Sequence, residues 1–99
     1  MSNQHLPVQE KVNKLVSLYE KNLLQEALIE AKSLVNQYPN VPVIYNIYGI
    51  INIALGNWKQ SAICFSKAIK LKTDYAEAHH NLGIALDNLG QLEEAIQSY

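Results

Sequence analysis

The sequence predicts an all-α fold in which antiparallel helix pairs stack on one another. Gly49 and Gly83 are separated by the same interval as Gly56 and Gly90, which is 34 positions in each case. A fixed period of this length is typical of arrays of stacked helical units. Apolar residues also recur at steps of three and four, and no segment shows the strict alternation of a half-buried strand. Such arrays usually bind another molecule on an extended surface and seldom carry a catalytic centre.

The first helix pair is predicted to follow a flexible tail, residues 1–7. From residue 8 onward, Val12, Val16 and Tyr19 place apolar side chains on one helical face. Asn22 interrupts this pattern, and a second apolar stripe begins soon after it. These features predict two helices that are joined near Asn22.

The second pair lies between two sets of helix breakers. Pro39 and Pro42 end the second helix and start the third, with Asn40 as its predicted N-cap. Gly56 then provides a turn, because glycine readily adopts the left-handed conformation at a helix C-terminus. The apolar pattern resumes at Trp58 and predicts a fourth helix.

A third pair is predicted to begin near Asp74. Asp74 and Glu77 have the spacing of a capping box, which indicates the start of a fifth helix. Gly90 is expected to turn the chain, and residues 92–99 are expected to begin a sixth helix. The predicted units are the repeats 8–41 and 42–75 and a truncated repeat 76–99.

The composition argues against several classes of partner. Of the 99 residues, 48% are hydrophobic and 17% are charged, which is enough for one packed domain. The net charge is −1 and all eight basic residues are lysines, so no nucleic acid is expected, because arginine is preferred for guanine edges and phosphates. No apolar run approaches the ~20 residues of a membrane span, so no membrane is expected. The polar N-terminus and the single cysteine, Cys64, favour a cytoplasmic location.

In 34-residue frames the chain resembles the tetratricopeptide repeat, whose pattern sets small and aromatic residues at fixed positions. The third frame matches through His79, Leu82, Gly83, Gly90, Leu92, Ala95 and Tyr99. The second frame matches through Tyr45, Tyr48, Gly49, Gly56, Trp58, Ser61, Phe65 and Ala68. The first frame is weaker, and keeps Ala27, Leu34 and Pro39 while Leu15 and Asn22 replace the two glycines.

The resemblance implies a right-handed superhelix, or α-solenoid, in which the first helix of each repeat lines a concave groove. The groove would present an apolar centre flanked by carboxylates, which favours a protein or peptide partner that is neutral or basic. The groove residues implied by the resemblance are Asn13, Val16, Tyr19, Asn46, Ile50, Ile53, Glu77, His80, Asn81, Ile84 and Asp87.

Two specialised groove types are weighed within the same resemblance. Members that grip a peptide carboxylate use Lys, Asn and Arg, but here only Asn81 fits, and Glu77 would repel the carboxylate. Members with an asparagine ladder bind a peptide backbone, and Asn13 and Asn81 occupy ladder positions while Ile47 interrupts them. A ladder therefore remains an alternative, and a carboxylate clamp is not expected.

No chemistry-bearing motif is recognised in the sequence. His79 and His80 are adjacent on a helix and point about 100° apart, so they cannot hold one metal ion as an i, i+4 pair would. The chain is therefore expected to be non-catalytic and to carry no cofactor. Two alternatives stay open: the substrate-presenting arm of a longer glycosyltransferase, sulfotransferase or oxygenase, and a purely structural oligomerisation module.

The end of the chain leads to a prediction of its own. If the sixth helix stops halfway, an apolar face stays uncovered, and such faces seek partners. Self-association through this C-terminal repeat is therefore expected, and the natural chain is expected to continue beyond residue 99. The face comprises Leu82, Leu86, Leu89, Leu92, Ile96 and Tyr99.

Overall fold

The computed structural model describes residues 5–97, which form helices joined by short turns and loops without a strand. Five helices follow one another along the chain and confirm the all-α prediction. They are α1 (His5–Glu20), α2 (Leu24–Gln37), α3 (Pro42–Ala54), α4 (Trp58–Leu71) and α5 (Ala76–Gln97).

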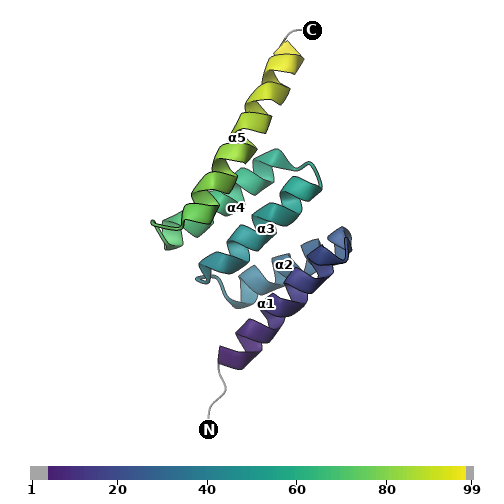
Figure 1. Ribbon diagram of the computed structural model, residues 1–99, viewed down its shortest axis with the longest axis vertical. Helices are drawn as coiled ribbons and strands as arrows, with labels where there is room; N and C mark the ends of the chain where they lie inside the picture. The colour runs from purple at the N-terminus through teal and green to yellow at the C-terminus, as the bar shows by residue number, and fades with distance from the viewer. Residues whose placement is uncertain (1–4, 98–99) are drawn as a thin grey trace.

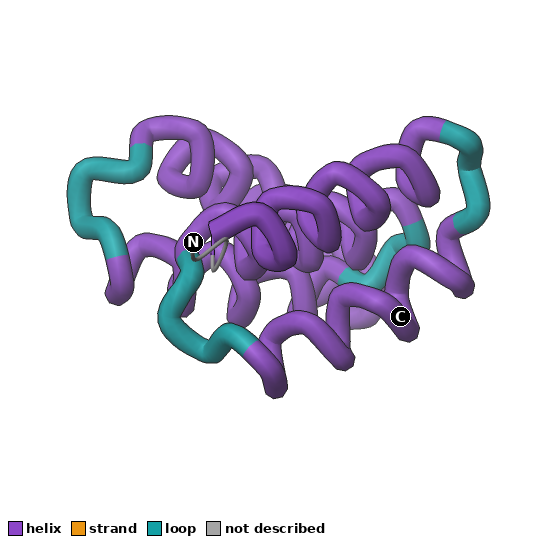
Figure 2. Tube along the Cα trace, turned by 90° about the horizontal axis from the view of Figure 1, so that it is seen from below, coloured by secondary structure: helices purple, strands orange, loops and turns teal. Residues whose placement is uncertain are grey.

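The helices form two layers. In Figure 1, α1, α3 and α5 lie side by side at the front, and α2 and α4 lie behind them. Each helix contacts the next along the chain, and α3 also contacts both α1 and α5. The loops lie at both ends of the helices (Figure 2). This is the stacking of helix pairs that the 34-residue period predicts.

The turns within the first two helix pairs use the same backbone conformation. Gly56, between α3 and α4, has φ 78°, and Asn22, between α1 and α2, has φ 62°. These residues occupy equivalent positions in successive repeats. Asparagine adopts this left-handed region more easily than other residues with a side chain. The first repeat therefore keeps the turn although it lacks the glycine.

The tail and the two caps differ from the predictions. Helix α1 already begins at His5, which places Pro7 in its first turn, where a missing N–H is tolerated. Helix α3 begins at Pro42 with Val41 at its N-cap and no capping side chain, so the cap predicted at Asn40 is wrong. Helix α5 begins at Ala76, too late for the capping box that was predicted from residue 74.

The turn predicted at Gly90 is also wrong. Helix α5 runs through Gly90 without a break, so residues 92–97, which were expected to begin a sixth helix, form its C-terminal end. A continued helix keeps its backbone hydrogen bonds, whereas a turn leaves carbonyl groups without partners. Glycine inside a helix costs about 1 kcal/mol, which is less than several lost hydrogen bonds. Tyr99 lies outside the described residues.

At one contact between the two helices of a pair, the large side chain comes from the first helix in one repeat and from the second helix in the other. In the second repeat, Gly49 on α3 faces the ring of the fully buried Phe65 on α4. A Cβ atom at Gly49 would lie 2.7 Å from Cδ1 and Cζ of that ring, which is too close. The equivalent positions of the first repeat hold Leu15 and Ala31, both fully buried. One repeat thus puts the large side chain on its first helix and the other on its second.

A second contact recurs in each linker between repeats. The Tyr45 hydroxyl donates to the carbonyl oxygen of Pro39 at 2.9 Å. Nε2 of His79 donates to the carbonyl oxygen of Thr73, also at 2.9 Å. The two donors are one repeat period apart, and so are the two acceptors. His79 therefore serves as a linker contact in the position of a tyrosine.

Candidate functional site

The front layer exposes a continuous surface that runs across three helices. Its residues lie three or four positions apart on α1, α3 and α5 and recur with the repeat period from one helix to the next. They are exposed or half-buried. We call this surface the A-helix face, and it consists of Asn13, Val16, Glu20, Ile47, Ile50, Ala54, Asn81, Ile84 and Asn88.

An apolar row forms the middle of the A-helix face. Val16 and Ile50 are half-buried, and Ile84 is 39% exposed. Each comes from a different helix, and α1, α3 and α5 are in contact in that order. The row can therefore accept apolar side chains from a partner along a line that crosses the helices.

Charged and polar side chains border this row. Glu77, His80 and Asp87 on α5 are exposed, and so is Glu20 on α1. Asn13 is exposed and accepts a hydrogen bond from the side chain of Gln9 at 3.0 Å. The border carries three carboxylates, which favours approach of a positive or neutral group over a negative one.

Two further predicted groove residues lie beside the row. Tyr19 is half-buried and packs against the hydrophobic core cluster of the first repeat. Ile53, its counterpart on α3, is also half-buried. Both keep part of their surface open, but Tyr19 is partly committed to packing.

Asn46 differs from the other predicted groove residues in its burial, because it is only 2% exposed. Its Oδ1 accepts a hydrogen bond from Nδ2 of Asn81 at 3.1 Å, which links α3 to α5. It also hydrogen-bonds with the hydroxyl of Tyr75. The Asn46 side chain therefore joins two repeats and has no open surface to offer a ligand. The residue one repeat period before Asn46 is Val12, which is apolar and buried. That apolar counterpart is the sequence signal that could have predicted the burial of Asn46.

This polar cluster also explains the pKa of the tyrosine next to it. Burial raises the pKa of Tyr75, the nearby Glu77 carboxylate adds to the rise, and the hydrogen bond to Asn46 opposes it. Asn81 is half-buried and its amide group already donates to Asn46. Only Asn13 among the predicted ladder residues has an exposed side chain, so the geometry gives little support to an asparagine ladder.

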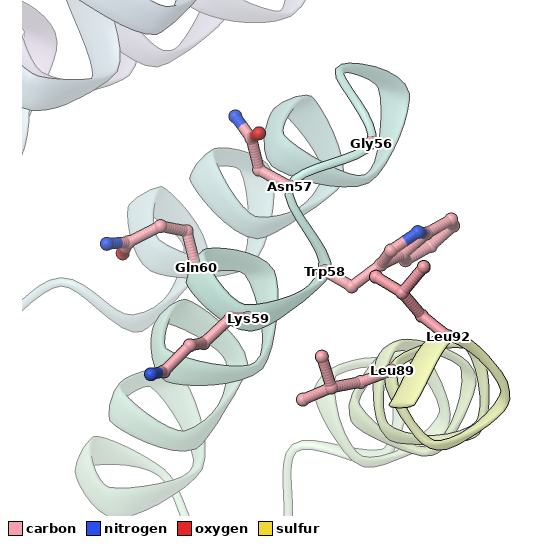
Figure 3. Close-up of a pocket in the computed structure, with 7 residues that line it drawn as sticks. All are labelled: Gly56, Asn57, Trp58, Lys59, Gln60, Leu89 and Leu92. Atoms are coloured by element: carbon pink, nitrogen blue, oxygen red, sulfur yellow. The ribbon is translucent and has the colours of Figure 1, made fainter. Parts of the chain in front are cut away.

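Two pockets lie away from the A-helix face. One, of about 260 Å³, is lined by Gly56, Asn57, Trp58, Lys59, Gln60, Leu89 and Leu92. Figure 3 shows the indole of Trp58 beside Leu92, with Leu89 on the same helix. The second, of about 330 Å³, is lined by Val41, Pro42, Val43, Lys72 and Tyr75. None of the predicted groove residues lines either pocket. The first pocket could not be predicted, because it depends on α5 remaining straight.

The residues that could take part in redox or metal chemistry are few and separate. Cys64 is buried, and burial raises the pKa of its thiol to about 11, while the hydrogen bond from Asn52 opposes this rise. The Nδ2 atom of Asn52 lies 3.8 Å from the Cys64 sulfur. Within residues 5–97, no three His, Cys, Asp or Glu side chains gather closely enough to hold a metal ion. No described helix has the length and apolar character needed to cross a membrane.

Comparison with known proteins agrees with the repeat geometry. Residues 64–97 match the family model described as the tetratricopeptide repeat. Protein FlbA of Caulobacter vibrioides is 29% identical over 84 residues, which is 85% of this chain and 14% of that protein. Superkiller complex protein 3 of Homo sapiens is 25% identical over 80 residues, which is 81% of this chain and 5% of that protein. The chain thus spans a small part of either relative.

Tetratricopeptide repeats generally mediate contacts between proteins and are typically non-catalytic. The matched segment, the 34-residue spacing and the stacked helix pairs agree with one another. The chain therefore carries a segment, residues 64–97, that matches the tetratricopeptide repeat, within stacked helix pairs that are consistent with that repeat.

Proposed function

We propose that the chain is a non-catalytic scaffold that binds a protein or peptide on the A-helix face. The apolar row Val16, Ile50 and Ile84 carries this proposal, because it crosses three helices and stays partly open to solvent. An extended peptide with apolar side chains would bury this row and gain roughly 25 cal/mol per Å² of apolar surface removed from water.

The border of the row determines which peptides fit. Glu20, Glu77 and Asp87 are exposed carboxylates. A peptide with an apolar centre and neutral or basic flanks would avoid repulsion there, whereas acidic flanks would not. Because these charges are exposed, salt should weaken the preference. Asn46 is not part of the proposed binding surface, since its side chain is buried.

Binding can be tested with two fluorescent peptides that share an apolar centre and differ in flanking Lys or Glu residues. The Lys-flanked peptide should bind more tightly in anisotropy titrations. Ile50→Lys should weaken that binding at least about tenfold, which corresponds to 1.4 kcal/mol. Ile63→Lys is the matched control, because Ile63 is 54% exposed on α4, in the other layer. Equal losses from the two variants would show that peptides bind elsewhere.

We also propose self-association through the C-terminal part of α5 as a second function. The observation that favours it is the exposure of Leu86, Leu92 and Ile96, at 51%, 51% and 65%. A role as the substrate-presenting arm of a longer glycosyltransferase, sulfotransferase or oxygenase stays a proposal too. A reducing compartment such as the cytoplasm would suit the thiol of Cys64.

A further inference from the structure

Helix α4, in the back layer (Figure 1), carries an exposed stripe of its own. Its residues follow one another at steps of four, three and four, which places them along one side of the helix. The stripe is about 16 Å long at 1.5 Å per residue, and its apolar member, Ile63, is 54% exposed. We call this set the α4 stripe, and it consists of Lys59, Ile63, Ser66 and Lys70.

The stripe belongs to a helix whose charge is of one sign. Helix α4 contains three lysines and no Asp or Glu, whereas α2, its counterpart, contains two glutamates and one lysine. The third lysine of α4, Lys67, is half-buried, and its Nζ atom lies 6.0 Å from the centre of the Tyr45 ring. Lys59 and Lys70 form no hydrogen bond or ion pair with another residue of the described part of the chain. Both ends of the stripe therefore present a positive charge to solvent.

The openness of this stripe does not depend on where the chain ends. The same stripe exists one repeat period earlier on α2, where its four members are exposed. Helices α3 and α4 follow α2, yet Ile29 is 68% exposed, and α2 does not contact α4. Stacking of a further repeat thus leaves this side of a back-layer helix open. The two stripes share an isoleucine and differ at their ends, since the α2 stripe consists of Gln25, Ile29, Lys32 and Asn36.

We propose that the α4 stripe binds an acidic protein segment with an apolar residue between its carboxylates. The apolar residue would cover Ile63, and the carboxylates would pair with Lys59 and Lys70. Lys59 lies in the first turn of α4, where the helix dipole also attracts negative charge. Complementary charges at the two ends would orient the segment along the helix.

The chemistry of the stripe favours an acidic protein segment over other anions. A phosphate backbone would leave Ile63 without an apolar cover, and the chain has no arginine to hold phosphates in a fork. A membrane surface requires a broader apolar face than one isoleucine. The A-helix face, with its bordering carboxylates, would repel the same segment. The two layers would thus select partners of opposite charge, and binding at the stripe does not rest on binding at the A-helix face.

The Glu-flanked peptide described above is the probe. In anisotropy titrations at low salt it should bind the 99-residue chain, more weakly than the Lys-flanked peptide does, because it covers one isoleucine and not a row of three apolar residues. Ile63→Ala, Lys59→Gln and Lys70→Gln should each weaken this binding at least about threefold. Added salt should weaken it as well, because the lysines are exposed.

Two matched controls separate the stripe from the charge of the whole helix. Lys67→Gln removes one charge from α4 away from the stripe, and Ile29→Ala removes the equivalent isoleucine from α2, so both should leave the affinity for the Glu-flanked peptide unchanged. Equal losses from Lys67→Gln and Lys70→Gln would overturn the proposal, and so would an Ile63→Ala variant that binds normally. Failure of the peptide to bind at millimolar concentration would overturn it too.

Other occupants of the stripe are distinguished by the same variants. Oligothymidine, or vesicles that contain phosphatidylserine, should bind more weakly than the Glu-flanked peptide and should not respond to Ile63→Ala. Equal or tighter binding of either one would overturn the choice of a protein segment. Sedimentation tests a second copy, since α5 carries four carboxylates and no lysine. Self-association that Lys59→Gln and Lys70→Gln abolish would assign the stripe to that copy and overturn the proposal, whereas an unchanged sedimentation profile supports it.

Discussion

The first two repeats fill the same contact with a large side chain on opposite helices of the pair. This predicts that substitutions can convert the second repeat to the arrangement of the first. Gly49→Leu combined with Phe65→Ala would give the second repeat the pair that the first repeat has at Leu15 and Ala31. Each substitution alone should be damaging. Together they should restore a filled interface, because the large side chain moves from one helix to the other.

The magnitudes follow from the burial and the close contact. Phe65 is fully buried, and Phe→Ala at such a site costs about 3–5 kcal/mol. At Gly49 the Cβ atom would lie 2.7 Å from ring atoms of Phe65, and overpacking of this kind costs about 1–3 kcal/mol or more. The gain of about 1 kcal/mol in helix propensity offsets part of that. If the two effects were additive, the double variant would lose about 5 kcal/mol of the free energy of unfolding. We expect it to lose less than about 2 kcal/mol.

Urea denaturation followed by circular dichroism would measure all four free energies of unfolding. A coupling of about 3 kcal/mol between the two positions is expected. If a single variant does not fold, the milder cycle of Gly49→Ala with Phe65→Leu gives the same comparison with smaller losses. A double variant no more stable than Phe65→Ala alone would refute the idea that the two repeats are alternative solutions to one packing problem.

Four further predictions concern single positions. Gly56→Ala should destabilise the fold by about 1–2 kcal/mol because φ is 78° there. Gly90→Ala should stabilise it by about 0.5–1 kcal/mol, because the helix is regular and the added Cβ meets no atom within 4 Å; thermal unfolding would show opposite shifts. Asn46→Ala should cost about 1–3 kcal/mol, since it leaves the amide of Asn81 without its partner, and a double-mutant cycle with Asn81→Ala would reveal the coupling. Burial raises the pKa of Cys64 to about 11, which predicts stability that is complete below about pH 9 and falls as the pH rises through about 11, by at most about 3 kcal/mol. A pH series in urea should lose this component in Cys64→Ala.

The sequence predicted the helix pairs because their turns and packing depend on residues close together in the chain. Gly56 forms the turn, and Asn22 takes its place one repeat earlier. The same reasoning failed at Gly90, which has the turn residue but lies in a helix. Glycine permits a left-handed turn without requiring one, and whether it turns depends on what packs behind it. Local sequence does not contain that information.

The candidate site was predictable to a similar degree. The resemblance to the tetratricopeptide repeat implied Val16, Ile50 and Ile84, and these residues lie one repeat period apart on α1, α3 and α5, which are in contact in that order. Asn46 is buried on α3 and accepts a hydrogen bond from Asn81 on α5. Its burial depends on how the repeats stack, whereas the polarity of its side chain alone predicted an exposed residue. The repeat boundaries stay predictions.

The hydrogen bond between Asn46 and Asn81 has a consequence for the mechanics of the array. An amide pair satisfies both groups in a narrow range of angles, so it fixes the orientation of α5 on α3. Among the described residues, no side-chain hydrogen bond joins α1 or α2 to α3, and that boundary is packed by apolar groups apart from the linker bond from Tyr45 to Pro39. Apolar contacts tolerate small sliding movements at low cost. A partner that changes the curvature of the A-helix face would therefore bend the chain between its first and second repeats, while the second and third repeats turn together as a rigid body.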